Sequence, residues 1–322
     1  MKLFIYALLM FLLLPVFLLG FPFYMIPILL SRGKISGTAY EPFNGRLLYH
    51  LSGSRFDPAA LQLAGGLPAT NRMFMGLLVR PIVWSSRISG YWPVMLDFPP
   101  PRPTPISAMV GARCEFLDQA MLDHVSAGDQ VVILGAGWDT RAYGLLKDQE
   151  VMIYEVDAPA TQAVKLAAIE KTGIDASHVT FVSCDFNRQS WLEELQNNGF
   201  DPAKRTFILW EGVTMYLEEH AIQSTLRAVS TLPAHSRIAF DFLSRAWLEE
   251  TLIGKTARLG VKATYGEPFT FGLPVTPDFS GQLTNYLAEH GLALDCGRPL
   301  GDEGSGKVPY GGLALAVTPT VP

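Results

Sequence analysis

The chain has 322 residues, with 25 basic and 30 acidic side chains and a formal net charge of −5. This acidic balance lacks the basic footprint of nucleic-acid-binding domains, so we expect no nucleic-acid partner. The three cysteines are scattered, and the six histidines include no pair at ligand spacing. The sequence therefore predicts neither a disulfide framework nor a metal site.

The amino end is an uncharged, apolar run over residues 3–30. About 20 such residues cross the hydrocarbon core of a bilayer, and the apolar core of a secretory signal peptide is shorter than this run. Pro15, Pro22 and Pro27 would kink a helix, so a bent or re-entrant segment and a cleaved signal stay open as alternatives. We favour a retained transmembrane anchor over residues 1–34.

The charges on either side of this run predict its orientation. Lys2 precedes the run, whereas Arg32, Lys34 and Arg46 follow it. Because basic residues concentrate on the cytoplasmic side of membrane segments, we expect the rest of the chain to face the cytoplasm. The membrane is therefore an expected partner.

A strand, a glycine turn and a second strand are predicted over residues 131–157, from the runs VVILGAGWDTR and VMIYEVD. Gly135 and Gly137 tolerate positive φ and let a ligand approach the backbone. Glu155 and Asp157 follow at about 20 residues, where a ribose hydroxyl needs an acceptor. The pattern favours the first half of a nucleotide-binding α/β domain over a βαβ unit without a ligand.

The residues after the turn indicate which nucleotide is bound. A dinucleotide-binding turn carries a third glycine, but here Gly137 is followed by Trp138, Asp139 and Thr140. Aspartate is a poor neighbour for a diphosphate, yet it suits a zwitterionic amino acid or a sulfonium, which S-adenosylmethionine provides. An NAD(P)-dependent oxidoreductase is the less favoured alternative, because it would need the third glycine or a Tyr-x-x-x-Lys pair.

Three further strands are predicted by the runs VTFVSCDF, TFILWEGVTMYL and RIAFDF. Apolar runs separated by helical segments indicate a parallel sheet covered on both faces, which binds ligands at the carboxyl ends of its strands. Asp157, Asp185 and Glu211 fall at that edge, and we expect them to line one site. Asp241 is interpreted as a helix cap.

The motifs LGAGWDTRAYGL, YEVDAP, VSCDF and LWEGVTMYL together resemble the S-adenosylmethionine-dependent methyltransferases related to leucine carboxyl methyltransferase, over residues 113–242. The resemblance implies the class I methyltransferase fold, α/β and Rossmann-like, with a mostly parallel sheet and helices on both faces. We expect this domain over residues 109–322, preceded by a helical cap and Pro-rich connector over residues 35–108 and by the transmembrane helix.

The resemblance also implies the cofactor-binding residues. They are Arg113, Gly135, Gly137, Asp157, Asp185, Phe186 and Glu211. Gly135 lies against the methionine part of S-adenosyl-L-methionine, Asp157 holds the ribose, and Asp185 with the Phe186 backbone meets the adenine.

The same resemblance assigns the charged end of the cofactor. Arg113 binds its carboxylate, for which a guanidinium fork is suited, and Glu211 lies near its ammonium group. Leucine carboxyl methyltransferases use a second basic residue further upstream, and its equivalent is not evident here. For Arg141, a structural ion pair and a cofactor contact are equally open, and Thr140 is a candidate N-cap for the helix expected after the turn.

The absence of a convincing base favours a carboxylate, or another oxygen that is already ionised, as the methyl acceptor. An ionised carboxylate needs no general base, whereas a hydroxyl does. His124 and Tyr216 are the nearby candidates, and each is better explained by a structural role. We therefore predict an O-methyltransferase acting on a small-molecule or protein-terminal carboxylate, with a non-catalytic membrane-tethered scaffold as the alternative. The sequence predicts neither a catalytic residue nor an oligomeric state.

Four flanking segments complete the prediction. Residues 73–84, MFMGLLVRPIVW, form either a helix touching the bilayer surface or a buried helix. Residues 254–277 are rich in glycine, proline and aromatic residues and predict a loop over the acceptor pocket. Residues 292–295 and 313–317 predict an antiparallel strand pair at the edge of the sheet.

Overall fold

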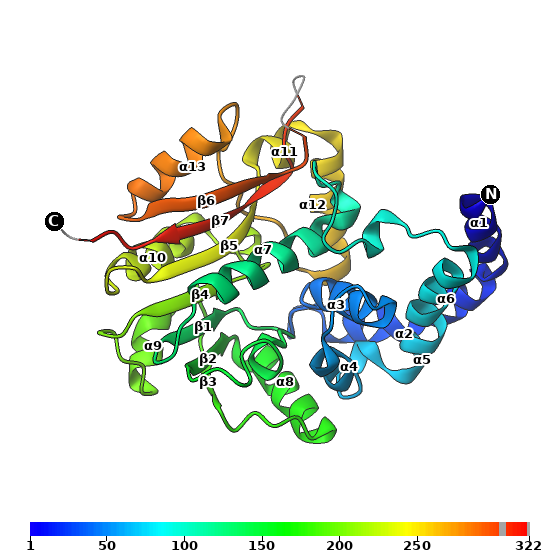
Figure 1. Cartoon of the computed structure of the whole chain (residues 1–322), viewed down its shortest axis with the longest axis horizontal. Coiled ribbons are helices and arrows are strands. Elements are labelled where there is room, and N and C mark those ends of the chain that lie inside the picture. The colour runs from blue at the N-terminus through cyan, green and yellow to red at the C-terminus, as the bar shows by residue number, and fades with distance from the viewer. Residues whose placement is uncertain (303–306, 321–322) are drawn as a thin grey trace.

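The computed structural model describes residues 1–302 and 307–320, within which seven strands form one sheet in the order β3-β2-β1-β4-β5-β7-β6 (Figure 1). The strands are β1 Gln130–Leu134, β2 Met152–Asp157, β3 Val179–Ser183, β4 Thr206–Trp210, β5 Arg237–Leu243, β6 Ala293–Leu300 and β7 Gly311–Val317. Strands β1 to β5 are parallel, and β7 runs antiparallel to β5 and β6. This is the class I methyltransferase sheet, and the predicted antiparallel edge pair is confirmed.

Side chains alternate between two cores along the buried strands, because successive residues of a strand point to opposite faces. In β1, Val131 and Ile133 face one core, whereas Val132 and Leu134 face the other. Helices cover both faces, as predicted. The first core receives α7 Met109–His124 and α8 Pro159–Thr172, and the second receives α9 Trp191–Asn197, α10 Glu219–Ser230 and α13 Phe279–Ala288.

The segment before α7 is helical and gathers beside the sheet (Figure 1). Its helices are α3 Tyr40–Ser52, α4 Pro58–Ala64, α5 Arg72–Phe74, the π-helix η2 Met75–Val79 and α6 Arg80–Ser89. Short 3₁₀ turns lie at η1 Pro68–Thr70, η3 Val94–Leu96 and η4 Ile106–Ala108. Tyr40, Phe43 and Leu47 of α3 are buried in the first core, so this cap shares the hydrophobic core of the sheet domain.

The apolar amino end forms two helices, α1 Lys2–Leu12 and α2 Leu14–Ser31. By length and composition α2 can cross a membrane, and it runs through Pro22 and Pro27 without ending. Gly20 lies so close to η2 that an added Cβ would be 2.7 Å from the Cβ of Leu77. The helix is thus fitted to the cap along one side, while most of its surface is exposed.

Residues 73–84 are helical and run through α5, η2 and the start of α6. Phe74 and Val79 are buried beneath this segment, whereas Met73 and Trp84 are exposed. The segment is therefore partly buried, and its contact with a bilayer surface stays a prediction.

The turn after β1 departs from the prediction of a capped helix. A single 3₁₀ turn, η5 Arg141–Tyr143, stands where a crossover helix was expected. Thr140 caps nothing, because its hydroxyl donates to the Asp57 carboxylate at 3.0 Å. The side chains of Asp139 and Arg141 are drawn into buried ion pairs, which fix the backbone in this short connection.

The predicted loop over residues 254–277 is wrong in its first half, which belongs to helix α12 Leu252–Tyr265. Gly254, Val261 and Tyr265 recur at helical spacing on its inner side, and the glycine composition obscured this pattern. Helix α11 Arg245–Glu250 precedes it and is capped by Ser244. The expectation that Asp241 is a helix cap is therefore also wrong.

Candidate active site

A cavity of about 380 Å³ opens at the carboxyl edge of the parallel strands. Its walls include all seven residues predicted to bind the cofactor, which are Arg113, Gly135, Gly137, Asp157, Asp185, Phe186 and Glu211. The cap contributes further wall residues from α3 and the segment before it, among them Thr38, Phe43 and Arg46. The cavity is thus shared between the sheet and the cap.

The glycine turn after β1 forms the floor of the cavity. Gly135 and Gly137 have φ of +66° and +40°, which side-chain-bearing residues rarely adopt. A Cβ on Gly135 would also lie 2.3 Å from Val213 Cγ2. The amides of Gly135 and Ala136 donate to the Val156 carbonyl at 2.8 and 3.1 Å, which ties the turn to β2.

Asp157, at the end of β2, presents its carboxylate to the cavity. It accepts hydrogen bonds from the Gly137 and Ala158 amides, and burial raises its pKa to about 6 against the opposing effect of these donors. Glu155 is different, because it is buried against Lys165 at 2.6 Å and the Tyr143 hydroxyl at 2.8 Å and does not line the cavity. Of the two strand-end acids, Asp157 alone reaches the cavity.

The loop after β3 closes the same end. Cys184, Asp185, Phe186 and Asn187 line it consecutively. The Asp185 carboxylate accepts from the Asn187 amide at 3.1 Å, and the Asp185 amide donates to the Gln189 side chain at 2.9 Å. These local contacts hold the loop in one shape, with the half-buried Phe186 ring packed on the second core.

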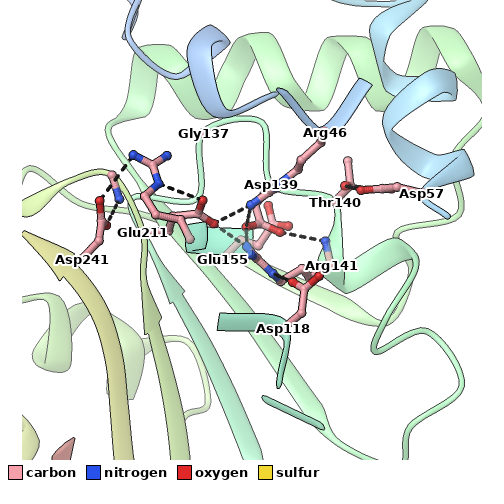
Figure 2. A network of polar contacts seen from close by, with 12 residues as sticks. Arg46, Asp57, Asp118, Gly137, Asp139, Thr140, Arg141, Glu155, Glu211 and Asp241 are labelled. Carbon is pink, nitrogen blue, oxygen red and sulfur yellow. Dashed lines mark hydrogen bonds and ion pairs between the residues drawn. The ribbon is translucent and has the colours of Figure 1, made fainter. Parts of the chain in front are cut away.

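The opposite end carries a buried network of charges (Figure 2). Glu211, just beyond β4, accepts from Arg46 at 2.5 Å, from Arg141 at 2.6 Å and from Arg113 at 3.4 Å. Burial opposes ionisation, but these guanidinium groups outweigh it and lower the pKa of Glu211 to about 2. Glu211 is therefore a carboxylate at neutral pH.

Asp139 is the second carboxylate of this network. It pairs with Arg46 at 3.0 Å and with Arg141, which also contacts Asp118 at 2.6 Å. Arg141 is fully buried behind the cavity wall and is absent from the cavity lining. Its geometry therefore favours the structural ion pair over the cofactor contact (Figure 2).

Arg46 is the basic residue that the sequence did not identify. It was expected to be a flanking charge of the membrane run, but its side chain is only 3% exposed and lines the cavity. Phe43 and Leu47 lie on the same face of α3 and are buried. A charged residue on an apolar helix face is the signal that could have found it.

Arg113 approaches the same carboxylates from α7. Its guanidinium lies 3.4 Å from Glu211 and 3.4 Å from Asp241. Its Nη2 is buried without a hydrogen-bond partner in the described part of the chain and would lie 3.4 Å from a Cβ on Gly212. Asp241 also accepts from the Gly212 amide, so it braces Arg113 and the turn after β4.

Of the two candidate bases, His124 lies far from the cavity and Tyr216 lines it. His124 ends α7 at the amino edge of the sheet, where its Nε2 lies 4.0 Å from Asp295, so its expected proximity to the site is wrong. Tyr216 does line the cavity, but burial raises its pKa. No histidine lines the cavity in the described ranges.

The remaining wall is apolar. It is formed by Met109, Met215, Leu243 and Phe269, with the Tyr216 ring 5.4 Å from that of Phe269. These residues pack on one hydrophobic cluster, separate from the charged network. The cavity therefore has a charged end, an end formed by Asp157 and the β3 loop, and an apolar wall.

The profile of the leucine carboxyl methyltransferase family matches residues 97–230, which span α7 to α10 and carry Arg113 through Glu211. The chain is 28% identical over 245 residues to a protein of Streptomyces avermitilis provisionally named an S-adenosyl-L-methionine-dependent methyltransferase, covering 71% of this chain and 83% of that protein. A relative from Mycobacterium tuberculosis with the same provisional name is 31% identical over 179 residues, covering 55% of this chain and 57% of that protein.

Solved structures of methyltransferases are also similar. The magnesium protoporphyrin IX methyltransferase of Synechocystis, solved with bound S-adenosylhomocysteine, has a TM-score of 0.42 and 12% identity, covering 64% of this chain and 81% of that one. A sarcosine dimethylglycine methyltransferase, provisionally so named, from Galdieria sulphuraria has a TM-score of 0.44 and 14% identity, covering 66% and 88%.

Proposed function

We propose that this chain, a leucine carboxyl methyltransferase-like S-adenosylmethionine-dependent methyltransferase, methylates a carboxylate oxygen of a small molecule or of a protein terminus. One observation carries the proposal. The acids beside the apolar wall already have donors, since Glu41 accepts from the Tyr265 hydroxyl at 2.8 Å and Glu267 from the Thr38 hydroxyl and the Gly37 amide. An acceptor that is already ionised needs no free base, which suits such a wall.

The charged end suits the methionine part of the cofactor. The unpartnered Nη2 of Arg113 is a buried donor, and Arg46 has a buried Nε in the same condition among the described residues. A ligand carboxylate would satisfy such donors, and leaving them unsatisfied costs about 1–3 kcal/mol each. We assign Arg113 and Arg46 to the cofactor carboxylate and Glu211 to the neighbourhood of its ammonium group.

The other end suits the nucleoside. Asp157 is the half-buried acceptor on the cavity wall that we assign to the ribose, and Gly135 and Gly137 leave room for the ligand against the backbone. Asp185 and the backbone of Phe186 are assigned to the adenine. These are the positions that resemblance to the family implies, and their common place on one cavity supports them.

The rate of methyl transfer then depends on how the methyl carbon and the acceptor oxygen are positioned. When bound, the cofactor supplies a methyl group activated as a sulfonium. Arg46, Arg113 and Glu211 hold the carboxylate and ammonium groups of its methionine part, so that the acceptor oxygen and the methyl carbon can be held in line. The apolar wall of Met109, Met215 and neighbouring residues excludes water from the reacting centre. A non-catalytic scaffold and an oxidoreductase are not favoured by the methyltransferase relatives.

We also propose that residues 1–34 anchor the protein in the membrane, with the cap of residues 35–108 and the catalytic unit of residues 109–322 facing the cytoplasm. The exposed apolar surface of α2 supports attachment. Arg32 and Lys34 remain on its carboxyl side after Arg46 is removed from the flanking charges. Carbonate-resistant sedimentation with protease protection of the domain from outside would test this topology.

The acceptor class is tested by the bond formed. The protein is incubated with methyl-labelled S-adenosylmethionine and a cell extract, and the product is treated with alkali. A carboxyl methyl ester releases volatile methanol, whereas an ether or N-methyl product keeps its label. Retention of all label after alkali would overturn the carboxylate proposal while leaving methyl transfer intact.

A further inference from the structure

Helix α12 has an exposed face that the proposed methyl transfer does not use. Leu252, Ile253 and Leu259 are 78%, 60% and 68% exposed. Single exposed apolar residues need no explanation, but here three large ones share one short helix. The inner face of the helix packs on the protein through Gly254 and Tyr265, so the outward direction of the three is fixed.

A basic stripe borders this apolar face. Lys255, Arg258 and Lys262 follow one another at i, i+3 and i+7, a spacing that aligns side chains on one side of a helix. Helix α12 itself contains no acidic residue. An apolar face beside a cationic stripe is the pattern of a helix lying in the plane of a bilayer with anionic lipids, because long basic side chains can extend to the head groups.

The position of α12 agrees with such a surface. Arg32, immediately after α2, donates from Nη2 to the Lys262 carbonyl at 3.0 Å. The same side chain covers Gly266, where an added Cβ would lie 3.1 Å from Arg32 Cγ. The end of the apolar α2 is thus fastened to the end of α12, which places α12 beside the boundary of the proposed membrane anchor.

The same helix leads directly into the cavity wall. Tyr265, its last residue, binds Glu41, and Glu267 holds the segment at Thr38. Phe269 follows on the apolar wall beside Tyr216. The chain therefore passes from the exposed face of α12 to the acceptor wall within a few residues, without an intervening domain.

We propose that α12 lies in the head-group layer of an anionic bilayer and that the acceptor is an amphiphilic acid, with an ionised carboxylate head and an apolar tail, taken from that bilayer. The inference rests on the proposed carboxylate methylation. The acceptor oxygen gains the methyl carbon as the sulfonium–methyl bond breaks, its electron pair stays on sulfur, and no proton is released. The apolar wall receives the proximal part of the tail.

The depth of α12 is tested without reference to catalysis. Full-length protein carrying Cys296→Ser, with a polarity-sensitive dye at Leu259→Cys, is reconstituted into phosphatidylcholine vesicles with and without phosphatidylglycerol. The matched control carries the dye at Leu122→Cys, an exposed leucine near the end of α7 at the opposite edge of the sheet. Head-group-labelled and shallow spin-labelled lipids should quench the dye at 259 and leave the dye at 122 unchanged, more strongly with phosphatidylglycerol.

Two results would overturn the surface assignment. An unquenched dye at 259 in protein that resists carbonate extraction would place α12 in water. Crosslinking of Leu259→Cys between copies in the same vesicles would assign this face to a second copy of the chain.

The acceptor class is tested by exchanging the three apolar residues. The variant Leu252→Ser/Ile253→Ser/Leu259→Ser is compared with the unmodified chain on a long-chain fatty acid in vesicles and on a short-chain, water-soluble acid. We expect the transfer rate on the vesicle acceptor to fall at least roughly tenfold, because the exchange removes most of the apolar surface that the helix would place in the bilayer. The rate on the soluble acid should change little. Equal loss on both acids, or none, would overturn the proposal. If the unmodified chain methylates neither acid, the carboxylate proposal fails instead, whatever the depth of α12.

Discussion

The two ends of the cavity are built in different ways. The nucleoside end depends on one strand–turn–strand unit, because Asp157 at the end of β2 is held by the amides of Gly137 in the turn after β1 and of the adjacent Ala158. The charged end depends on four distant segments, which bring Arg46, Arg113, Asp139 and Glu211 together. At the first end Asp157 is held by backbone amides beside the loop after β3, whereas the second end is a network in which each charge supports the others.

This difference predicts how substitutions at each end affect ligand binding and stability. A lone carboxylate can be removed with loss of one ligand contact and little else. A member of a buried charge network cannot, because its partners remain buried without compensation. Variants at the two ends should therefore differ in how binding and stability are affected.

The largest effect is expected at Glu211. Glu211→Ala leaves the guanidinium groups of Arg46, Arg141 and Arg113 facing one another, and breaking a buried pair costs about 3–5 kcal/mol. The free energy of unfolding, from urea titration of the full-length protein in detergent, should fall by this amount. Glu211→Gln is the control of equal shape. An unchanged unfolding midpoint for the alanine variant would show that the network does not support the fold.

The next largest effect is expected at Arg113, and it should appear in catalysis. Arg113→Ala removes the buried fork assigned to the cofactor carboxylate, and a misplacement of the methyl group by about 1 Å can slow transfer on the order of 100-fold. The transfer rate at saturating S-adenosylmethionine should fall, and the dissociation constant of S-adenosylmethionine should rise. Arg113→Lys, which keeps the charge but loses the fork, should recover only part of the loss.

The contrast between the ends also explains what the sequence could predict. The strands, the glycine turn and Asp157 follow from local signals, which are continuous apolar runs, two closely spaced glycines and an acid at a strand end. Arg46 could not be placed by such patterns, because its partners lie on segments far away in the chain. A helical pattern that includes the apolar Phe43 and Leu47 would have indicated that Arg46 is buried, but not which carboxylates it meets.

The errors elsewhere have the same origin. The helix expected after the glycine turn is absent because Asp139 and Arg141 engage tertiary partners, which local propensity does not register. Helix α12 was mistaken for a loop because Gly254 and Gly260 lower helix propensity, whereas packing on the protein decides the outcome. Sequence patterns thus predicted the sheet and its ligand edge better than the parts that fold onto them.

An intermediate effect is expected at Asp157. Asp157→Ala should weaken S-adenosylhomocysteine binding by about 1.5–3 kcal/mol, the size of a hydrogen bond to a charged group, as measured by calorimetry. The Asp157→Asn variant tests the charge alone. A smaller loss of unfolding free energy than at Glu211 is the result that supports the comparison, and an equal loss would contradict it.

The pH dependence of binding provides a second test at Asp157. Its pKa of about 6 means that the carboxylate is ionised above this pH and protonated below it. An ionised acceptor binds a ribose hydroxyl better, so affinity should fall as the pH drops through about 6. In the ligand-free protein the raised pKa affects folding in the opposite direction, because the folded state binds the proton more tightly than the unfolded state. The free energy of unfolding should therefore rise as the pH falls from about 6 toward the usual pKa of aspartate. The pH dependence of the affinity and that of the stability should both disappear in Asp157→Asn.

The smallest effect is expected at His124, which lies at the opposite edge of the sheet from both ends of the cavity. Its Nε2 is 4.0 Å from the half-exposed Asp295, and burial lowers its pKa, so the pair contributes little at neutral pH. His124→Ala should leave the transfer rate unchanged and alter the free energy of unfolding by no more than about 0.5 kcal/mol. The decisive comparison is the transfer rate at saturating cofactor beside that of Arg113→Ala. If His124→Ala abolished transfer while Arg113→Ala were silent, both the position of the active site and the carboxylate acceptor would have to be abandoned.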